Sequence, residues 1–152
     1  MGQRKYRINW AWALIITMLP FYSGCAAIAP SVIAVKEAGF TESGRKEAFN
    51  KSIRGFYSAL FWQNIAQALD YVDENNRDSM FKWIRSFKRP NRIVDTKIES
   101  LTFDEGAFSA EVEVSRKIMN DDTRVVKTVV QKEIWVFSRM QGWKVKSVQN
   151  VG

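Results

Sequence analysis

The hydrophobic positions of residues 41–87 recur every three or four residues, which is the spacing of one face of a helix. Thr41 or Ser43 can cap a first helix, because either hydroxyl can accept a hydrogen bond from a free N–H of the first turn. Asn64 and Gln67 have the spacing of a capping box and start a short second helix. A third helix follows, and Pro90 ends it. The three apolar faces are Phe49, Ile53, Phe56, Tyr57 and Leu60; Ile65, Ala68, Leu69 and Val72; and Met80, Trp83, Ile84 and Phe87.

Beyond Pro90 the period of the pattern changes to two, because apolar residues alternate with polar ones as they do on half-buried strands. This pattern predicts strands over residues 94–100, 108–115, 124–137 and 143–148. The intervening turns contain Asp104-Glu105-Gly106, Asn120-Asp121-Asp122 and Gln141-Gly142. Such short connections join antiparallel neighbours. Three helices followed by a four-stranded meander predict an α+β fold.

In this order of elements the chain resembles the NTF2-like (cystatin-like α+β) superfamily. The matching features are the Phe/Tyr-rich helix from Phe49 to Leu60, the short helix from Asn64 to Val72, and the closing Gly142-Trp143-Lys144-Val145. The resemblance implies a domain of residues 41–152, in which three N-terminal helices pack on the concave side of a curved four-stranded antiparallel sheet. It also implies a short strand before the third helix, which Tyr71-Val72 matches. Because the superfamily is functionally diverse, its fold does not select a function.

The third predicted strand has apolar residues on both faces. One face carries Val126, Val130, Ile134 and Val136, and the other carries Val125, Val129, Trp135 and Phe137, interrupted by Lys127, Gln131 and Glu133. With helices on one side of the sheet only, one of these rows meets water, and a row of this size exceeds what monomeric surfaces usually carry. NTF2-like domains commonly dimerise through the outer sheet face. We therefore predict a homodimer, or an envelope protein bound to that face.

The segment before the domain has the order of a secretory signal, a basic start followed by the apolar stretch of residues 8–21. At its end, Tyr22-Ser23-Gly24-Cys25 resembles the lipobox of bacterial lipoproteins. The resemblance implies a signal peptide of residues 1–24, acylation of Cys25 with chains such as palmitate, and a tether that runs to residue 40. The acylated Cys25 would hold the protein in the lipid bilayer. Ala26 replaces the family's aspartate signal for inner-membrane retention, so in a diderm bacterium we expect the outer membrane, facing the periplasm.

A second interpretation of the N-terminus stays open. No charged residue occurs between Arg7 and Lys36, and this run exceeds the roughly 20 residues that a membrane helix needs. An uncleaved transmembrane anchor is therefore the alternative, although Pro20 and Pro30 would interrupt it. Both interpretations leave the positive end in the cytoplasm and export the rest.

The chemical inventory excludes several function classes. The net charge is +7 at pH 7 and falls to +4 without the three basic residues of the signal, which is too little for a nucleic-acid-binding composition. The chain has no histidine and one cysteine, so it has no His-based triad and no internal disulfide. We expect no metal and no cofactor. Asp70, Asp73 and Glu74 are the acids near the expected mouth of the cone, and we interpret them as a solvated helix end rather than a general base.

Two sets of side chains are candidates for binding. The aromatic set is Phe56, Tyr57, Trp62, Trp83 and Phe87. It either lines an apolar pocket or fills the core, and its helical spacing favours the core. The basic set is Lys82, Arg85, Lys88, Arg89 and Arg92. It either meets lipid phosphates or another acidic envelope component, or it stabilises the C-terminus of the third helix, and the position of that helix end favours stabilisation.

Together these features favour an exported, lipid-anchored, non-enzymatic module of the cell envelope that binds a partner or a small apolar ligand. One alternative is a small NTF2-like enzyme, of isomerase or hydrolase type, with a buried acid beside the aromatic set. The other is a component of a secretion or envelope machine, similar to VirB8-type periplasmic domains, which keep an uncleaved membrane helix.

Overall fold

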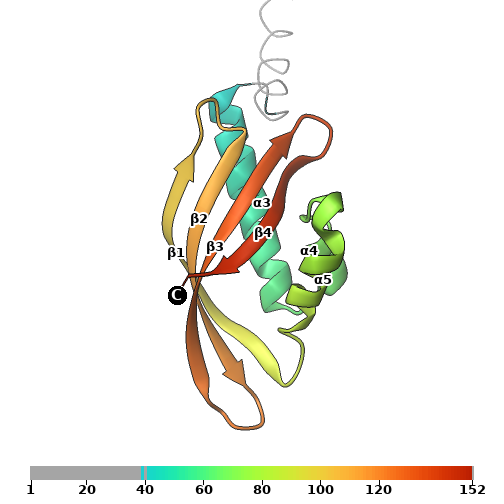
Figure 1. Ribbon diagram of the computed structural model, residues 1–152, viewed down its shortest axis with the longest axis vertical. Coiled ribbons are helices and arrows are strands. Elements are labelled where there is room, and N and C mark those ends of the chain that lie inside the picture. The colour runs from blue at the N-terminus through green and yellow to red at the C-terminus, as the bar shows by residue number, and fades with distance from the viewer. Residues whose placement is uncertain (1–38, 40, 152) are drawn as a thin grey trace, which may run out of the picture. The chain divides into compact units, whose positions relative to one another are not determined.

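A long helix and a four-stranded antiparallel sheet form the two main layers of the domain (Figure 1). The computed structural model describes Gly39 and residues 41–151. These residues belong to one compact unit, Val35–Gly152, and every member of the described core lies within it. A fragment with these bounds therefore keeps all the described core contacts. The order of three helices followed by four strands confirms the predicted α+β class.

Helix α3 (Glu42–Phe61) begins at Thr41, whose side-chain oxygen accepts a hydrogen bond from the Gly44 N–H at 3.1 Å. Its buried face follows the predicted spacing and packs on the sheet. The ring of Phe49 meets those of Trp135 and Trp143 edge-on, with centroids 5.5 and 5.0 Å apart. Such aromatic pairs contribute about 0.5–1.5 kcal/mol each beyond the area they bury. No described helix has the length and apolar character that a membrane crossing requires.

Helix α4 (Ile65–Leu69) starts as predicted, because the Asn64 side chain accepts a hydrogen bond from the Gln67 N–H at 3.2 Å. It ends at Leu69, and the prediction that it reaches Val72 is wrong. Val72 instead forms an isolated parallel bridge with Val145, at the place where the resemblance implied a short strand. Hydrogen bonds to the final strand flank Val72, since Val145 N–H donates to the Tyr71 carbonyl at 2.8 Å and Asp73 N–H donates to the Val145 carbonyl at 3.0 Å.

Helix α5 (Arg77–Arg85) follows a 3₁₀ turn, η2 (Glu74–Asn76), that occupies the predicted polar break. The helix ends at Arg85, earlier than the predicted stop at Pro90. The Ser86 hydroxyl donates to the Trp83 carbonyl at 2.7 Å, a local bond that competes with continuation of the helix. Phe87 is buried beyond the helix end, although it continues the apolar face that the spacing predicts.

Gly55 sets how closely α3 approaches the segment that follows α4. It lies in the middle of the helix, where glycine costs roughly 1 kcal/mol relative to alanine. A Cβ atom added at this position would collide with the hydroxyl and ring of Tyr71. The absence of a side chain therefore leaves room for the Tyr71 ring, which also packs edge-on against Phe56 at 6.3 Å.

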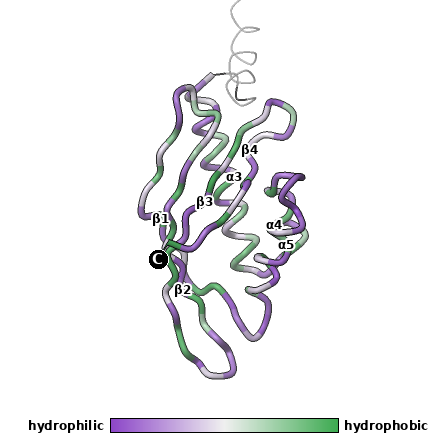
Figure 2. The backbone as a smooth tube through the Cα atoms, in the orientation of Figure 1, coloured by the Kyte–Doolittle hydropathy of each residue, from purple (hydrophilic) through white to green (hydrophobic). Residues whose placement is uncertain are grey.

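The sheet is an open meander in the order β1 (Asn91–Phe103), β2 (Ser109–Asn120), β3 (Val126–Ser138) and β4 (Gly142–Asn150). Hydrophobic and hydrophilic residues alternate along these strands in Figure 2. β1 is longer than predicted, and its register shifts at two irregularities, between Ile93 and Asp95 and between Ile98 and Ser100. The expected alternation breaks at both points. Ile93 is consequently buried, whereas Ile98 is 42% exposed.

The two faces of β3 have opposite roles. The row that contains Gln131, Glu133 and Trp135 faces the helices and is buried. The sequence pattern left open which of the two rows meets water, and the structure turns the row interrupted by Gln131 and Glu133 into the domain. Val130, Ile134 and Val136 alternate with them and occupy the outer face, where each is half-buried.

Candidate functional site

A network of polar side chains lies on the inner face of the sheet. Arg116 follows the buried alternation of β2, and Gln131 and Glu133 occupy the matching positions of β3. All three are buried, and Arg116 and Glu133 are fully shielded from solvent. One guanidinium nitrogen of Arg116 donates to Gln131 Oε1 at 2.6 Å, and another donates to Glu133 Oε1 in an ion pair. The amide of Gln131 in turn donates to Asn150 Oδ1 at 2.9 Å.

The Glu133 carboxylate has a donor on each oxygen. Arg116 binds one oxygen, while Tyr57 Oη and Trp135 Nε1 both donate to the other at 2.9 Å. Burial, reinforced by the negative charge of Glu133, raises the pKa of Tyr57 well above its ordinary value of 10.0, so the phenol stays a donor. These three donors hold the Glu133 carboxylate in place as a structural acceptor.

Aromatic rings enclose the Arg116 guanidinium. Its central carbon lies 5.3 Å from the ring centroids of both Tyr57 and Trp83. Arg116 Nε is the one buried side-chain nitrogen or oxygen in residues 41–151 that has no hydrogen-bond partner. Since a buried ion pair costs desolvation energy, these ring contacts help to offset that cost.

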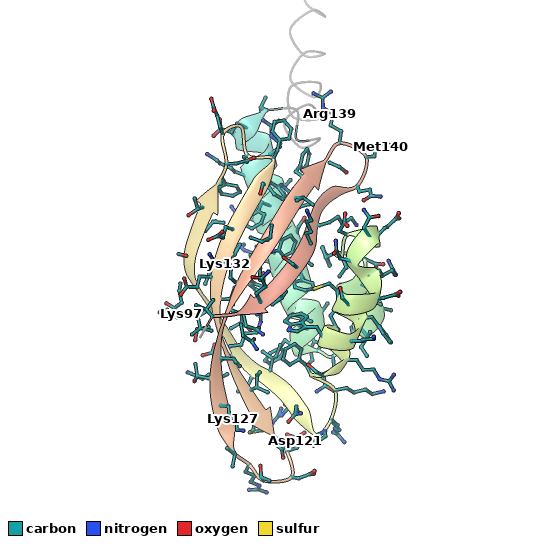
Figure 3. All side chains as sticks on the ribbon, viewed as in Figure 1. Lys97, Asp121, Lys127, Lys132, Arg139 and Met140 are labelled. Atoms are coloured by element: carbon teal, nitrogen blue, oxygen red, sulfur yellow. The ribbon has the colours of Figure 1, made fainter. Side chains whose placement is uncertain are left out.

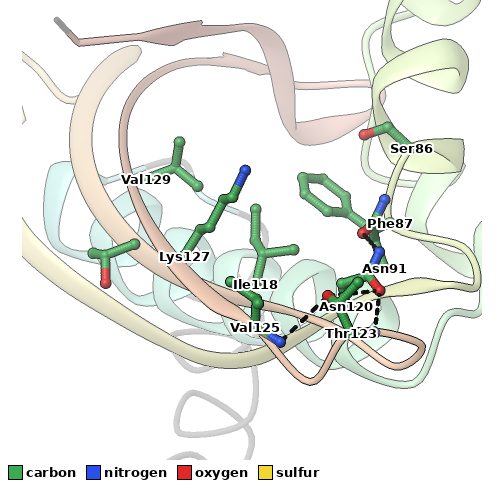
Figure 4. A pocket seen from close by; sticks show the side chains of 10 residues that line it. Ser86, Phe87, Asn91, Ile118, Asn120, Thr123, Val125, Lys127 and Val129 are labelled. Carbon is green, nitrogen blue, oxygen red and sulfur yellow. Dashed lines mark hydrogen bonds between the residues drawn. The ribbon is translucent and has the colours of Figure 1, made fainter.

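A groove of about 670 Å³ opens beyond the network, where the β2–β3 hairpin extends past the helices (Figures 1 and 4). Its apolar walls are Phe87, Ile118, Val125 and Val129, and Ser86, Asn91, Asn120, Thr123, Lys127 and Thr128 add polar groups. Ile118 and Val129 lie two residues from Arg116 and Gln131 on the same inward rows. The groove therefore continues the inner face of the sheet outward from the ion pair.

Lys127 is the one charged residue in the lining of this groove. It pairs directly with Ile118 across the β2–β3 ladder, and Figure 4 shows its side chain directed into the space that Ile118, Val129 and Phe87 surround. The side chain of Lys127 makes no ion pair or hydrogen bond with any residue that the structure describes. The groove thus combines apolar walls with one unpaired positive charge.

The aromatic set divides between core and surface. Phe56 is fully buried and stacks with Trp83 at 6.3 Å, and the Trp83 ring meets that of Phe87 at 4.8 Å. Tyr57 donates to Glu133. Phe87 alone of the set lines the groove. Trp62 lies apart, 75% exposed, beside Phe61.

All five members of the basic set are exposed: Lys82, Arg85, Lys88, Arg89 and Arg92. Arg89 and Arg92 line a second cavity together with Trp62. Arg92 Nε also donates to Asp121 Oδ1 at 2.9 Å. The Asp121-Asp122 pair lies in the β2–β3 turn, and no cluster of three potential metal ligands occurs among residues 41–151.

The acids near the expected mouth lie away from the groove. Asp70 and Glu74 line a separate surface cavity beside Lys144. Asp73 Oδ1 accepts hydrogen bonds from Asn75 N at 3.1 Å and Asn76 Nδ2 at 3.0 Å, so it caps the 3₁₀ turn. The structure does not bring these acids to the aromatic set. Cys25 lies outside the described residues.

The buried network is what the sequence interpretation missed. The signal was present, because Arg116 has the same parity as Val112 and Val114, and Glu133 has the same parity as Trp135. A meander pairing of these strands brings opposite charges together on one face. Opposite charges at inward positions of neighbouring strands therefore indicate a buried ion pair.

Comparison with known proteins supports the fold. No protein-family model and no curated protein matches the chain. A SEC-C motif containing protein from Rhodopseudomonas palustris matches with a TM-score of 0.56 and 12% identity, over 66% of this chain and 77% of that chain. A ketosteroid isomerase-like protein from Erwinia carotovora atroseptica matches with a TM-score of 0.54 and 12% identity, over 70% of this chain and 95% of that chain. A protein with a cystatin-like fold from Nostoc punctiforme matches with a TM-score of 0.51 and 10% identity, over 69% of this chain and 88% of that chain. These likenesses support the NTF2-like (cystatin-like) fold and carry no function.

Proposed function

We propose that this chain is a non-enzymatic binding module of the cell envelope, anchored through its N-terminus, whose groove binds a small molecule with an apolar body and an anionic head. The observation that carries the proposal is the unpaired Lys127 among apolar walls. The groove volume of about 670 Å³ falls within the range usual for ligand pockets, roughly 300–1,000 Å³. A negatively charged head would complement Lys127, because the lining contains no acid.

The state of Glu133 favours binding over catalysis. A general base needs a free lone pair within reach of the proton that it removes. Both Glu133 oxygens already accept hydrogen bonds, from Arg116, Tyr57 and Trp135, and the side chain has no exposed surface. The enzyme alternative requires a buried acid free to react beside the aromatic set, and Glu133 is the acid found there.

Anchoring rests on the sequence. The basic start, the apolar stretch and Ser23-Gly24-Cys25 support acylation at Cys25 and placement at an envelope membrane. The alternative of a secretion or envelope machine component requires the same topology with an uncleaved helix. The mass of the mature N-terminus separates the two, because cleavage before Cys25 removes 24 residues and adds acyl chains.

The groove is tested with three probes of equal chain length: decanoate, decan-1-ol and decylammonium. Calorimetric titration into residues 35–152 should show that decanoate binds best and decylammonium worst. Lys127→Met should remove the preference for decanoate over decan-1-ol and leave decan-1-ol binding in place. Lys146→Met, which removes an exposed lysine outside the groove, is the matched control. Equal affinity for the three probes, or no binding of any, would contradict the proposal.

A further inference from the structure

Two exposed aromatic rings lie beside the basic set at the C-terminal end of α3. Trp62 is 75% exposed and Phe61 is 46% exposed, and their rings meet edge-on at 5.2 Å. They line a surface cavity of about 390 Å³ whose other lining residues are Gln63, Arg89, Arg92, Ile93 and Asp121. Neither ring belongs to the core cluster of the domain. Packing of the core therefore gives no reason for their placement.

The charge around these rings is mainly positive. Lys88, Arg89 and Arg92 are exposed in and next to the loop between α5 and β1, and Lys82 and Arg85 are exposed on α5 just before it. Asp121 is the one acid in the cavity lining, and it pairs with Arg92. Asp122 and Arg124 follow in the same hairpin turn and have opposite charges. Cations thus outnumber acids across this surface.

Stabilisation of a helix end explains only part of the basic set. The effect of the helix dipole falls off within the last turn. Lys82 and Arg85 lie in the last turn of α5 and satisfy this condition. Arg89 and Arg92 lie four and seven residues beyond the last helical residue, Arg85. Asp121 pairs with Arg92, but the exposure of Arg89 beside Trp62 requires a different reason, and the excess of positive charge on this surface calls for an anionic partner.

We propose that Phe61, Trp62, Lys88, Arg89 and Arg92 form a docking surface for the headgroup layer of a bilayer that contains anionic phospholipid. Tryptophan is favoured at membrane–water interfaces, because its ring is apolar and its N–H remains hydrated. Basic side chains close to an anionic leaflet contribute about fivefold each to membrane affinity at moderate salt. The surface contains both elements side by side. The proposal does not depend on the ligand of the groove.

The test uses residues 35–152, so that the apolar N-terminal segment contributes nothing. Co-sedimentation with vesicles of phosphatidylcholine alone is compared with vesicles that also contain phosphatidylglycerol. The fragment should bind only the anionic vesicles, and added salt should weaken the binding. Lys88→Gln/Arg89→Gln should lower the partition coefficient roughly 25-fold, which is about fivefold for each charge removed. Trp62→Ala should also weaken binding, with an unchanged melting temperature because Trp62 lies outside the core.

Two matched controls distinguish this surface from general attraction. Arg54→Gln/Lys146→Gln removes the same charge from exposed positions elsewhere, and Met140→Ala truncates a side chain that is 97% exposed. Both should bind anionic vesicles like the unaltered fragment. Figure 3 shows Met140 at the end of the sheet opposite Asp121. The proposal would be overturned if the control variants lost as much vesicle affinity as the test variants, or if the fragment bound neutral vesicles equally well. It would also be overturned if the fragment bound an acidic protein but not the anionic vesicles.

Discussion

Arg116 of β2 and Glu133 of β3 form an ion pair whose side chains are both fully shielded from solvent. Neighbouring groups complete it, since Tyr57 and Trp135 donate to the carboxylate and Gln131 accepts from the guanidinium. Such a pair contributes little net stability compared with a well-packed apolar pair, but loss of one partner leaves a buried charge unpaired. We therefore expect the two partners to depend on each other.

Removal of one partner should be costly, and removal of both should be less so. Glu133→Gln leaves the Arg116 charge unpaired and should lower the free energy of unfolding by about 3–5 kcal/mol. Arg116→Met/Glu133→Gln should recover much of that loss, because the remaining amide oxygen can still accept from Tyr57 and Trp135. Urea unfolding of residues 35–152 measures both. If the double variant loses as much free energy of unfolding as Glu133→Gln and Arg116→Met lose separately in sum, the two residues are not coupled.

Tyr57 should give the domain a stability loss at high pH. The folded pKa of Tyr57 is raised, so above pH 10 the phenol ionises in the unfolded chain while it remains protonated in the folded one. Stability is therefore fully present below about pH 10 and falls as the pH rises beyond it. In chemical unfolding at several pH values, Tyr57→Phe should lack this extra decline. Tyr71→Phe, which keeps the Tyr57 phenol, should retain it, and identical slopes in all three proteins would refute the assignment.

The groove can be filled from a single position on β3. Val129 faces the groove, and its neighbour Val130 lies on the outer face of the same strand. Val129→Trp should occupy the space between Ile118 and Phe87 and lower decanoate affinity at least about tenfold, since a binding site filled by a ring excludes the chain. Val130→Trp is the matched control and should bind decanoate normally. Normal binding by Val129→Trp would place the ligand elsewhere.

The outer sheet face remains our proposed contact for a second copy or an envelope protein. Val130, Ile134 and Val136 lie there half-buried, and Lys132 pairs with Glu111 across the same face at 2.7 Å. Ile134→Glu should split a dimer and leave the fold intact, whereas Val129→Glu would disturb the groove instead. Sedimentation of residues 35–152 at tens of micromolar, roughly the reach of a weak interface, measures the effect. A monomer under these conditions would remove the homodimer and leave the partner.

Attachment depends on Cys25. Cys25→Ala should abolish acylation and leave an uncleaved precursor, because the thiol is the group that receives the lipid. Labelled palmitate in cells expressing either form gives the measurement, and the mass of the purified protein reports cleavage. Equal palmitate labelling of both forms would contradict the lipoprotein proposal. An unmodified, uncleaved N-terminus in the unaltered protein would favour the membrane-helix alternative.

Periodicity in the sequence predicted the helices and the strand order because burial on one face dominates both. The spacing of Phe49, Ile53, Phe56 and Leu60 survives in α3 as a buried stripe. The pattern failed where hydrogen bonds override it. Val72 has helical spacing, yet it pairs with Val145. The alternation of β1 breaks at two register shifts, which the sequence pattern does not predict.

The site was harder to predict than the fold, because its key residues look like surface residues. Arg116 and Glu133 are charged residues on strands that also carry outward charges, such as the exposed Lys117 and the half-buried Lys132. Strand parity alone separates the inward pair from the outward ones. The groove forms where the β2–β3 hairpin extends past the helices. Lys127 and Phe87 are far apart in the sequence, so the sequence does not show that they line the same groove.

The close approach of α3 to Tyr71 also restricts which residues related sequences can carry at positions 55 and 71. A Cβ atom at position 55 would force the Tyr71 ring to move from its place against α3, and Tyr71 directly precedes Val72, which bridges to β4. In a collection of related sequences, glycine at position 55 should therefore persist wherever position 71 is aromatic, and larger residues should appear at 55 only together with small ones at 71. Such paired variation would identify distant relatives that overall identity does not reveal.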